Sequence, residues 1–192
     1  MELFALSDLS TPWCLHVVVT LKVAEHIDAG TTAIGDLAGA CGASPDSLQR
    51  VLRHLVAKGV FDEPEPGRFV LNRAARGLLE PPIQLALDLN AFGGRMSYVW
   101  GGLLDAVKSG APVYHEMFGR PFWEDLEAHP HIGASFDALM GPGHGTPDPD
   151  IPLADGWDSI ATVVDVGGGT GAMLAEILRA RPRVPAPPPK CR

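Results

Sequence analysis

The sequence is short of cysteine, of positive charge and of metal-binding patterns. Its three cysteines form no CxxC pair, which argues against a disulfide framework or a four-thiolate zinc site and favours a reducing compartment. No pair of histidines has the spacing of a helical zinc site, so we expect no metal. The sequence has 15 Lys and Arg residues and 23 Asp and Glu residues, which gives a net charge of −8. This negative charge argues against a protein that binds nucleic acid or anionic membranes.

Targeting and membrane segments are missing from the pattern as well. The first residues lack the basic and apolar regions of a secretion signal. No run approaches the roughly 18 consecutive apolar residues of a membrane-spanning helix. These absences predict a cytoplasmic protein that does not enter a membrane.

The stretch from Trp13 to Ile27 is apolar almost all round and predicts a first helix without a polar face. Such a helix must be covered on several sides. We expect a second copy of the chain to cover it, because a small domain has few elements of its own to do so. The alternative is a central helix in a monomeric bundle.

The next forty residues have the pattern of a winged helix-turn-helix. Apolar residues recur at helical spacing from Ile34 to Cys41 and from Leu48 to Val56, with Ser44-Pro45 as the start of the second helix. Two short β-prone runs, 60–61 and 69–71, then flank a loop of turn residues and predict a hairpin.

This motif raises the possibility of DNA binding. The polar face of the second helix carries five suitable side chains: Gln49, Arg50, Arg53, His54 and Lys58. The hairpin, however, carries Asp62, Glu63 and Glu65, which phosphates would repel, and residues 1–80 hold seven basic against ten acidic side chains. We therefore expect a dimerisation or scaffold role, with a ligand-responsive transcription regulator as the alternative.

After Pro81-Pro82 the sequence predicts short helices, two of them between Ile83 and Val107 and split at Gly93-Gly94. Aromatic and methionine side chains concentrate here. Such a cluster forms ordinary core or lines a pocket for a flat aromatic substrate. A connector rich in glycine and proline follows at 141–156.

A β-branched run, Ile160–Val166, leads into the glycine loop 167–171 (Gly-Gly-Gly-Thr-Gly) and a helical stretch 172–181. Strand, glycine turn and helix form the first unit of a Rossmann-like sheet. The glycine spacing also fits a dinucleotide such as NAD. Asp165 decides between the ligands, because a carboxylate repels a pyrophosphate and suits the ammonium group of S-adenosylmethionine.

Taken together, these features resemble the S-adenosylmethionine-dependent small-molecule O-methyltransferases. The similarity is greatest to the bacterial enzymes that modify aromatic polyketides of the anthracycline type, which are relatives of the plant caffeate-type enzymes. Four segments carry the resemblance: Leu52–Leu55, Gly119–Leu126, Ser135–Met140 and Val163–Gly171.

The resemblance implies a mainly α N-terminal winged-helix domain followed by an incomplete α/β Rossmann-like domain. The parts would be a winged-helix dimerisation domain (1–80), a helical substrate-side segment with connector (81–150), the first βα unit of the S-adenosylmethionine-binding domain (151–181) and a proline-rich irregular tail (182–192). It also implies a homodimer formed through the N-terminal domain.

The resemblance assigns two sets of site residues and no catalytic residue. The amino-acid end of S-adenosylmethionine would be held by Asp165, Gly167, Gly169 and Gly171. The aromatic substrate or the donor would lie near Phe122, Trp123, Phe136 and Met140.

The end of the sequence departs from the family pattern. After Arg181 it is rich in proline, which lacks the N–H that a central strand needs, so the second strand of the sheet is not expected here. The acidic residue that would bind the ribose is missing too. The sequence therefore predicts a truncated methyltransferase that is inactive alone, with a non-catalytic dimerisation partner of a full-length enzyme as the alternative.

Overall fold

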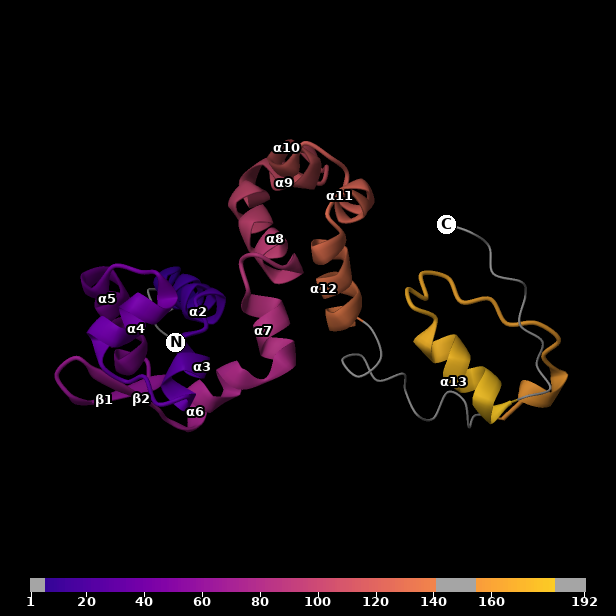
Figure 1. Ribbon diagram of the computed structural model, residues 1–192. Coiled ribbons are helices and arrows are strands. Elements are labelled where there is room, and N and C mark those ends of the chain that lie inside the picture. The colour runs from indigo at the N-terminus through magenta and orange to yellow at the C-terminus, as the bar shows by residue number, and fades with distance from the viewer. Residues whose placement is uncertain (1–5, 141–154, 182–192) are drawn as a thin grey trace. The chain divides into compact units, whose positions relative to one another are not determined.

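The computed structural model describes residues 6–140 and 155–181, so most of the connector and the whole proline-rich tail lie outside the described residues. The chain divides into two compact units, Met1–Ser135 and Phe136–Arg192 (Figure 1). Within the described residues, no helix has the length and apolar character needed to span a bilayer.

The N-terminal apolar stretch forms two helices, α2 (Ser10–Thr20) and α3 (Val23–Asp28), so the predicted continuous helix is wrong. Lys22, between them, has a left-handed backbone with φ of 54°, which helical hydrogen bonding cannot continue through. The break turns Val23 and Ile27 of α3 into the core. Two later helices of the same unit, α5 (Pro45–Ala57) and α7 (Pro81–Leu87), pack against α2, so much of its cover comes from its own chain.

Two helices and a hairpin follow in the order that the sequence predicts. They are α4 (Ile34–Cys41), α5 (Pro45–Ala57), β1 (Phe61–Glu65) and β2 (Arg68–Leu71). The strands pair antiparallel, with Phe61 opposite Leu71, and the register shifts between Asp62 and Glu65. Proline at the first turn starts α5 without the loss of a hydrogen bond.

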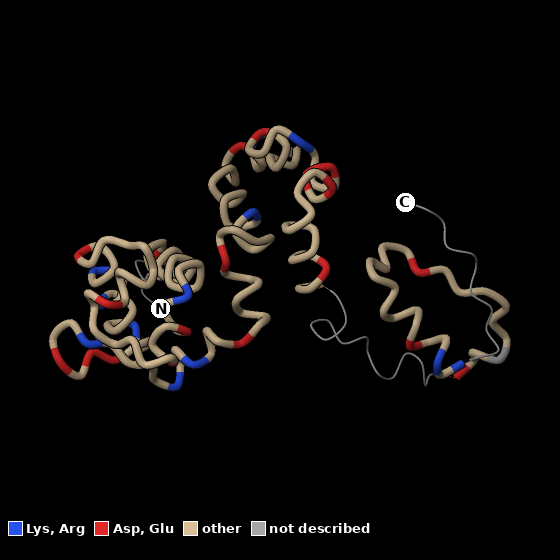
Figure 2. Tube along the Cα trace, in the orientation of Figure 1, with Lys and Arg blue, Asp and Glu red and all other residues tan. Residues whose placement is uncertain are grey.

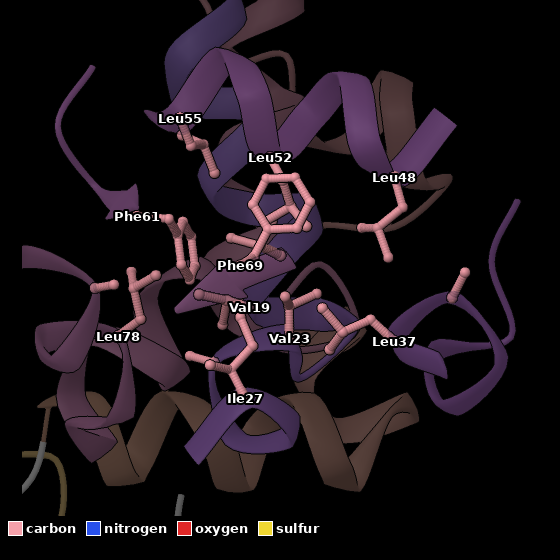
Figure 3. Packing of buried hydrophobic residues seen from close by; sticks show 14 residues of the cluster. Val19, Val23, Ile27, Leu37, Leu48, Leu52, Leu55, Phe61, Phe69 and Leu78 are labelled. Atoms are coloured by element: carbon pink, nitrogen blue, oxygen red, sulfur yellow. The ribbon is translucent and has the colours of Figure 1, made fainter. Parts of the chain in front are cut away.

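The core of unit 1 lies between these helices and the hairpin. Figure 3 shows Phe61 and Phe69 of the two strands facing Leu52 and Leu55 of α5, and all four are fully buried. Leu37 of α4 and apolar residues of α2 and α3, such as Val19 and Val23, belong to the same cluster. Apolar side chains of α2, α3, α4, α5 and one face of the hairpin thus supply the hydrophobic free energy that holds the N-terminal part together.

A chain of short helices forms the rest of unit 1. They are α6 (Arg73–Arg76), η1 (Gly77–Leu79), α7 (Pro81–Leu87), α8 (Phe92–Val99), η2 (Trp100–Gly102), α9 (Leu103–Ser109), α10 (Tyr114–Phe118), α11 (Phe122–Ala128) and α12 (Pro130–Met140), whose last turn enters unit 2. The predicted break at Gly93-Gly94 is wrong. The chain breaks before Phe92, and both glycines are buried inside α8. The backbone of α7 at Leu85 and Ala86 leaves no room for a side chain at Gly93, and the backbone of Leu89, between the two helices, leaves none at Gly94.

His16 of α2 ties the N-terminal part to these helices. Its Nδ1 lies 2.7 Å from the carbonyl oxygen of Leu87 at the end of α7, and its Nε2 lies 2.8 Å from the hydroxyl of Ser97 on α8. Because a carbonyl oxygen only accepts, Nδ1 carries a proton and donates. The buried ring is therefore bonded at both nitrogens, as burial of a polar group requires.

The predicted strand Ile160–Val166 in unit 2 is wrong for the described residues. They contain one sheet, β1–β2, and the segment 160–166 pairs with no neighbour in it. A strand exists only through hydrogen bonds to an adjacent strand, so the apolar run stays open, with Val164 and Val166 69% and 91% exposed. After the glycine loop, α13 (Ala172–Ala180) forms as predicted.

Candidate functional site

The glycine loop of unit 2 has the backbone that its sequence requires. Gly167, Gly169 and Gly171 all have positive φ, between 54° and 75°, a region that side chains with a Cβ rarely adopt. Gly171 is the residue before α13, and its N–H donates to the carbonyl oxygen of Gly168 at 2.8 Å. The turn therefore delivers the chain into α13, whose first N–H groups have no partner within the helix.

Asp165 lies against this turn and has an unused acceptor. A Cβ on Gly168 would overlap the Asp165 carboxylate, so only glycine leaves the space that this side chain occupies. The Oδ2 atom of Asp165 is buried and accepts no hydrogen bond from a described residue. A buried acceptor without a donor costs about 1–3 kcal/mol, so the position favours a ligand that donates, such as an ammonium group, over a phosphate.

The aromatic residues predicted near the substrate divide between the two units. Phe122 and Trp123 begin α11 in unit 1, with ring centroids 4.8 Å apart. Phe136 and Met140 lie one turn apart on the part of α12 that belongs to unit 2. The loop residues Asp165, Gly167, Gly169 and Gly171 are together on one turn, whereas the four aromatic and methionine positions come from two helices that belong to different units.

Phe122 lies at the centre of a cluster of aromatic side chains. Its ring is 6.0 Å from that of Phe92 and 5.3 Å from that of Tyr114, both nearly edge to face. Tyr114 in turn contacts Phe118, with centroids 4.8 Å apart. Trp123 is mostly exposed. Of this pair, Phe122 is part of the packing of α8, α10 and α11, and Trp123 offers an open aromatic face.

A buried carboxylate that the sequence did not reveal holds this cluster together. Asp125, 1% exposed, accepts a hydrogen bond of 2.7 Å from the hydroxyl of Tyr114 and lies 3.4 Å from Nε of Arg95. The guanidinium of Arg95 stacks over the Phe118 ring at 4.3 Å, and Nδ1 of His129 is 2.9 Å from Asp125 Oδ1. Asp125 thus links α11, on which it lies, to α8 through Arg95 and to α10 through Tyr114.

The pKa of Tyr114 is raised, first by burial and then by its hydrogen bond to Asp125. A group whose pKa is higher in the folded protein adds stability below its unfolded pKa, near 10, and that stability is lost as the pH rises further. The chain has two tyrosines, so a Tyr98→Phe variant isolates Tyr114. We expect absorbance at 295 nm to show no phenolate at about pH 10.5 until the protein unfolds.

The control is Asp125→Asn in the same Tyr98→Phe protein. It removes the negative charge and should lower the pKa of Tyr114, so that phenolate forms at a lower pH than with Asp125. Phenolate that appears near pH 10 in the folded protein with Asp125 intact would contradict the buried Tyr114–Asp125 bond.

The basic side chains of α5 are bonded within the chain. Nε and Nη2 of Arg53 donate to Glu63 of the hairpin at 2.9–3.2 Å, which lowers the pKa of Glu63. Lys58 pairs with Asp8 at 2.8 Å, His54 lies 2.8 Å from the Thr11 hydroxyl, and Arg50 pairs with Asp46. Figure 2 shows acidic residues along the β1–β2 hairpin. A DNA phosphate would have to displace these partners.

We therefore expect no retardation of duplex DNA by the chain at about 150 mM salt, where weak non-specific binding is largely lost. Glu63→Gln releases Arg53 and serves as a comparison, because it should raise any residual binding at low salt. A shifted band with the unmodified chain that persists at this salt would support the regulator alternative.

Metal ligands are absent from the described part of the chain. Residues 6–140 and 155–181 contain no group of three or more His, Cys, Asp or Glu side chains that could hold an ion. The two described cysteines, Cys14 and Cys41, are free and half-buried, and burial raises the pKa of both thiols. Neither thiol is therefore activated as a nucleophile.

Two family models match the sequence. The O-methyltransferase dimerisation domain matches residues 4–81, and the O-methyltransferase domain matches residues 100–186. The matches cover both the helix–helix–hairpin part and the glycine loop.

The sequence is also similar to curated enzymes of Streptomyces. The chain is 39% identical over 179 residues to 2,7-dihydroxy-5-methyl-1-naphthoate 7-O-methyltransferase of Streptomyces carzinostaticus. The aligned region covers 92% of this chain and 54% of the relative. It is 38% identical to aclacinomycin 10-hydroxylase RdmB of Streptomyces purpurascens, over 93% of this chain and 49% of the relative. The chain spans about half the length of the curated relatives it matches.

The chain is also similar to proteins of known structure. The O-methyltransferase NcsB1 from neocarzinostatin biosynthesis, solved with S-adenosyl-L-homocysteine and 1,4-dihydroxy-2-naphthoic acid, matches with a TM-score of 0.86 and 37% identity. The match covers 97% of this chain and 58% of that chain. The structure of TnmH matches with the same TM-score and 41% identity, over 96% of this chain and 55% of that one.

Proposed function

The chain belongs to the O-methyltransferase family, and we propose that it is part of an enzyme that transfers a methyl group from S-adenosylmethionine to a hydroxyl of an aromatic small molecule. The observation that carries the proposal is the glycine loop with its buried, unpartnered Asp165 oxygen. Relatives that act on naphthoates support an aromatic acceptor of the polyketide type.

The residues of the loop fit the methyl donor. S-adenosylmethionine supplies an electrophilic methyl group on a sulfonium. Asp165 would accept hydrogen bonds from its ammonium group, and the free N–H groups at the start of α13 suit its carboxylate. Gly167, Gly169 and Gly171 let the backbone approach the ligand without a Cβ.

The substrate side is proposed to come from the helical segment. Phe122, Trp123, Phe136 and Met140 would flank the aromatic acceptor, with Asp125 fixing α10 and α11 beneath Phe122. Such packing of a flat acceptor orients its hydroxyl toward the donor, and positioning supplies much of the rate of such a transfer. No side chain is assigned as a general base.

We also propose the domain organisation and the partner. Residues 1–80 would form a winged-helix dimerisation domain and make a homodimer. Residues 81–150 would form the substrate-side segment, and 151–181 would begin a Rossmann-like domain. The protein would work in the cytoplasm. The described residues of unit 2 hold the glycine loop and α13 without a paired strand, so we expect that the 192 residues alone do not methylate.

A chimera tests this function. Residues 1–181 are joined to the C-terminal half of the Streptomyces carzinostaticus relative and supplied with labelled S-adenosylmethionine and 1,4-dihydroxy-2-naphthoic acid. We expect a product heavier by one CH₂ group that carries the label. A product heavier by one oxygen atom would favour the hydroxylation suggested by the relative RdmB.

Two further measurements test the alternative that the chain is a non-catalytic partner of a full-length enzyme. Calorimetry of the 192-residue chain with S-adenosylmethionine should show no binding, and micromolar binding would contradict the incomplete donor site. Co-purification of the chain as a heterodimer with a full-length homologue, combined with an inactive chimera, would support the partner alternative.

A further inference from the structure

His16 is a buried ionisable side chain that the proposed methyl transfer does not use. It is 7% exposed and lies between α2, the end of α7 and α8. Its Nδ1 donates to the carbonyl oxygen of Leu87, so a second proton on the ring has to bind at Nε2. Burial disfavours a charged histidine, and a buried N–H without an acceptor costs further free energy.

Ser97 supplies the acceptor that this second proton needs. Its Oγ lies 2.8 Å from Nε2 of His16 and 2.9 Å from the carbonyl oxygen of Gly93. Because a hydroxyl has one proton and can also accept, Ser97 donates to Nε2 when the ring is neutral. When Nε2 takes a proton from solvent, Nε2 donates to Ser97, whose own proton turns to Gly93. The two states thus differ in hydrogen positions alone, and both ring nitrogens stay bonded in each.

Two neighbours of the ring favour a positive charge on it. Leu87 is the last residue of α7, and the carbonyl groups at the C-terminal end of a helix attract a cation. The ring of Trp13 lies with its centroid 5.6 Å from that of His16, and aromatic rings attract cations at this range. Both contributions oppose the cost of burying the charge.

No other ionisable side chain of the described residues forms a hydrogen bond or an ion pair with His16. Helix α7 carries none, and α2 is packed against α3, α5 and α7 and is bonded to α8. The ionisable side chains on these elements and beside them are Cys14 of α2, Glu25, His26 and Asp28 of α3, Asp46, Arg50, Arg53 and His54 of α5, Asp88 after α7, and Arg95 and Tyr98 of α8. The charge of His16 is therefore not fixed by an ion pair.

We infer that His16 and Ser97 form a proton-dependent hydrogen-bond switch that connects α2 to α8. The protonated state makes three hydrogen bonds, from Nδ1 to Leu87, from Nε2 to Ser97 and from Ser97 to Gly93. The first two are charge-assisted and therefore stronger than neutral ones. The neutral state makes two, so acid strengthens the connection between the helices. The switch is a property of unit 1 and does not depend on the proposed methyl transfer.

Nitrogen-15 NMR of the 192-residue chain with labelled histidine tests the switch. The chain has seven histidines, and the signals of His16 are identified by their loss in His16→Gln. We expect both ring nitrogens of His16 to carry protons in acid, and Nδ1 alone to keep its proton in alkali. A ring with one proton at every pH from about 5 to about 8, or a neutral ring protonated at Nε2, overturns the inference.

Ser97→Ala removes the acceptor of the Nε2 proton. The midpoint of the His16 titration should then move to lower pH by about one unit or more, an about tenfold loss of proton affinity, because a hydrogen bond to a charged group is lost. The matched control is Ser109→Ala. Ser109 donates to the carbonyl oxygen of Asp105 at 2.7 Å, as Ser97 can to that of Gly93, but it has no bond to a histidine.

The control should leave the midpoint of the His16 titration unchanged. An unchanged midpoint in Ser97→Ala as well would contradict the switch and leave the proposed function standing. The titration of the unmodified chain decides by itself if Ser97→Ala does not fold.

Discussion

Replacing Gly93 with alanine is expected to cost on the order of 3 kcal/mol of unfolding free energy or to prevent unit 1 from folding. A Cβ at Gly93 would overlap the carbonyl of Ala86 and come within 2.8 Å of the Leu85 carbonyl oxygen. Backbone atoms cannot rotate away as a side chain can, so α7 and α8 would have to separate. Urea unfolding followed by circular dichroism measures the loss.

Gly101→Ala is the matched control for this substitution. Gly101 lies in η2, and a Cβ there meets nothing within 4 Å. The change should leave the unfolding free energy within about 0.5 kcal/mol or raise it, because alanine favours helices over glycine. Equal effects of Gly93→Ala and Gly101→Ala would contradict the close contact between α7 and α8.

Replacing Asp165 with asparagine should weaken binding of S-adenosyl-L-homocysteine to the chimera at least about tenfold, because a charge-assisted hydrogen bond to its ammonium group contributes about 1.5–3 kcal/mol. Gly168→Ala should weaken binding as well, since its Cβ would overlap the Asp165 carboxylate. Titration calorimetry measures both affinities.

Glu176→Gln provides the control for the loss of one negative charge. Glu176 lies on α13, beyond the loop, and is half-buried. Its replacement should leave the affinity within about twofold, because it removes a charge without removing a hydrogen bond to the ligand. An Asp165→Asn chimera that binds as tightly as its parent would remove Asp165 from the donor site.

The N-terminal fold was predictable because its signals are local. The apolar stripe and initial proline of α5 and the turn residues of the hairpin each specify their element without reference to distant residues. The break at Lys22 was not predicted, because lysine has no preference for the left-handed backbone conformation that it adopts here. Gly93 was misread as a break, since the sequence does not show whether a glycine marks a turn or a close approach.

The site was predictable only where its residues form a contiguous sequence motif. The carboxylate and glycines of the loop are such a motif, and the turn has the expected positive φ values. The prediction of a strand before the loop was wrong, because a strand depends on neighbouring strands that the described residues do not supply. Asp125 was missed because burial of an acid depends on Tyr114 and Arg95, which come from other helices.

The most direct measurement is a crystal structure of the chimera grown with both S-adenosyl-L-homocysteine and NAD. The account predicts the amino-acid end of S-adenosyl-L-homocysteine on the loop, with its ammonium group bonded to Asp165 and its carboxylate at the start of α13. A pyrophosphate seated on Gly167–Gly171, or a loop closed against every ligand, would contradict it.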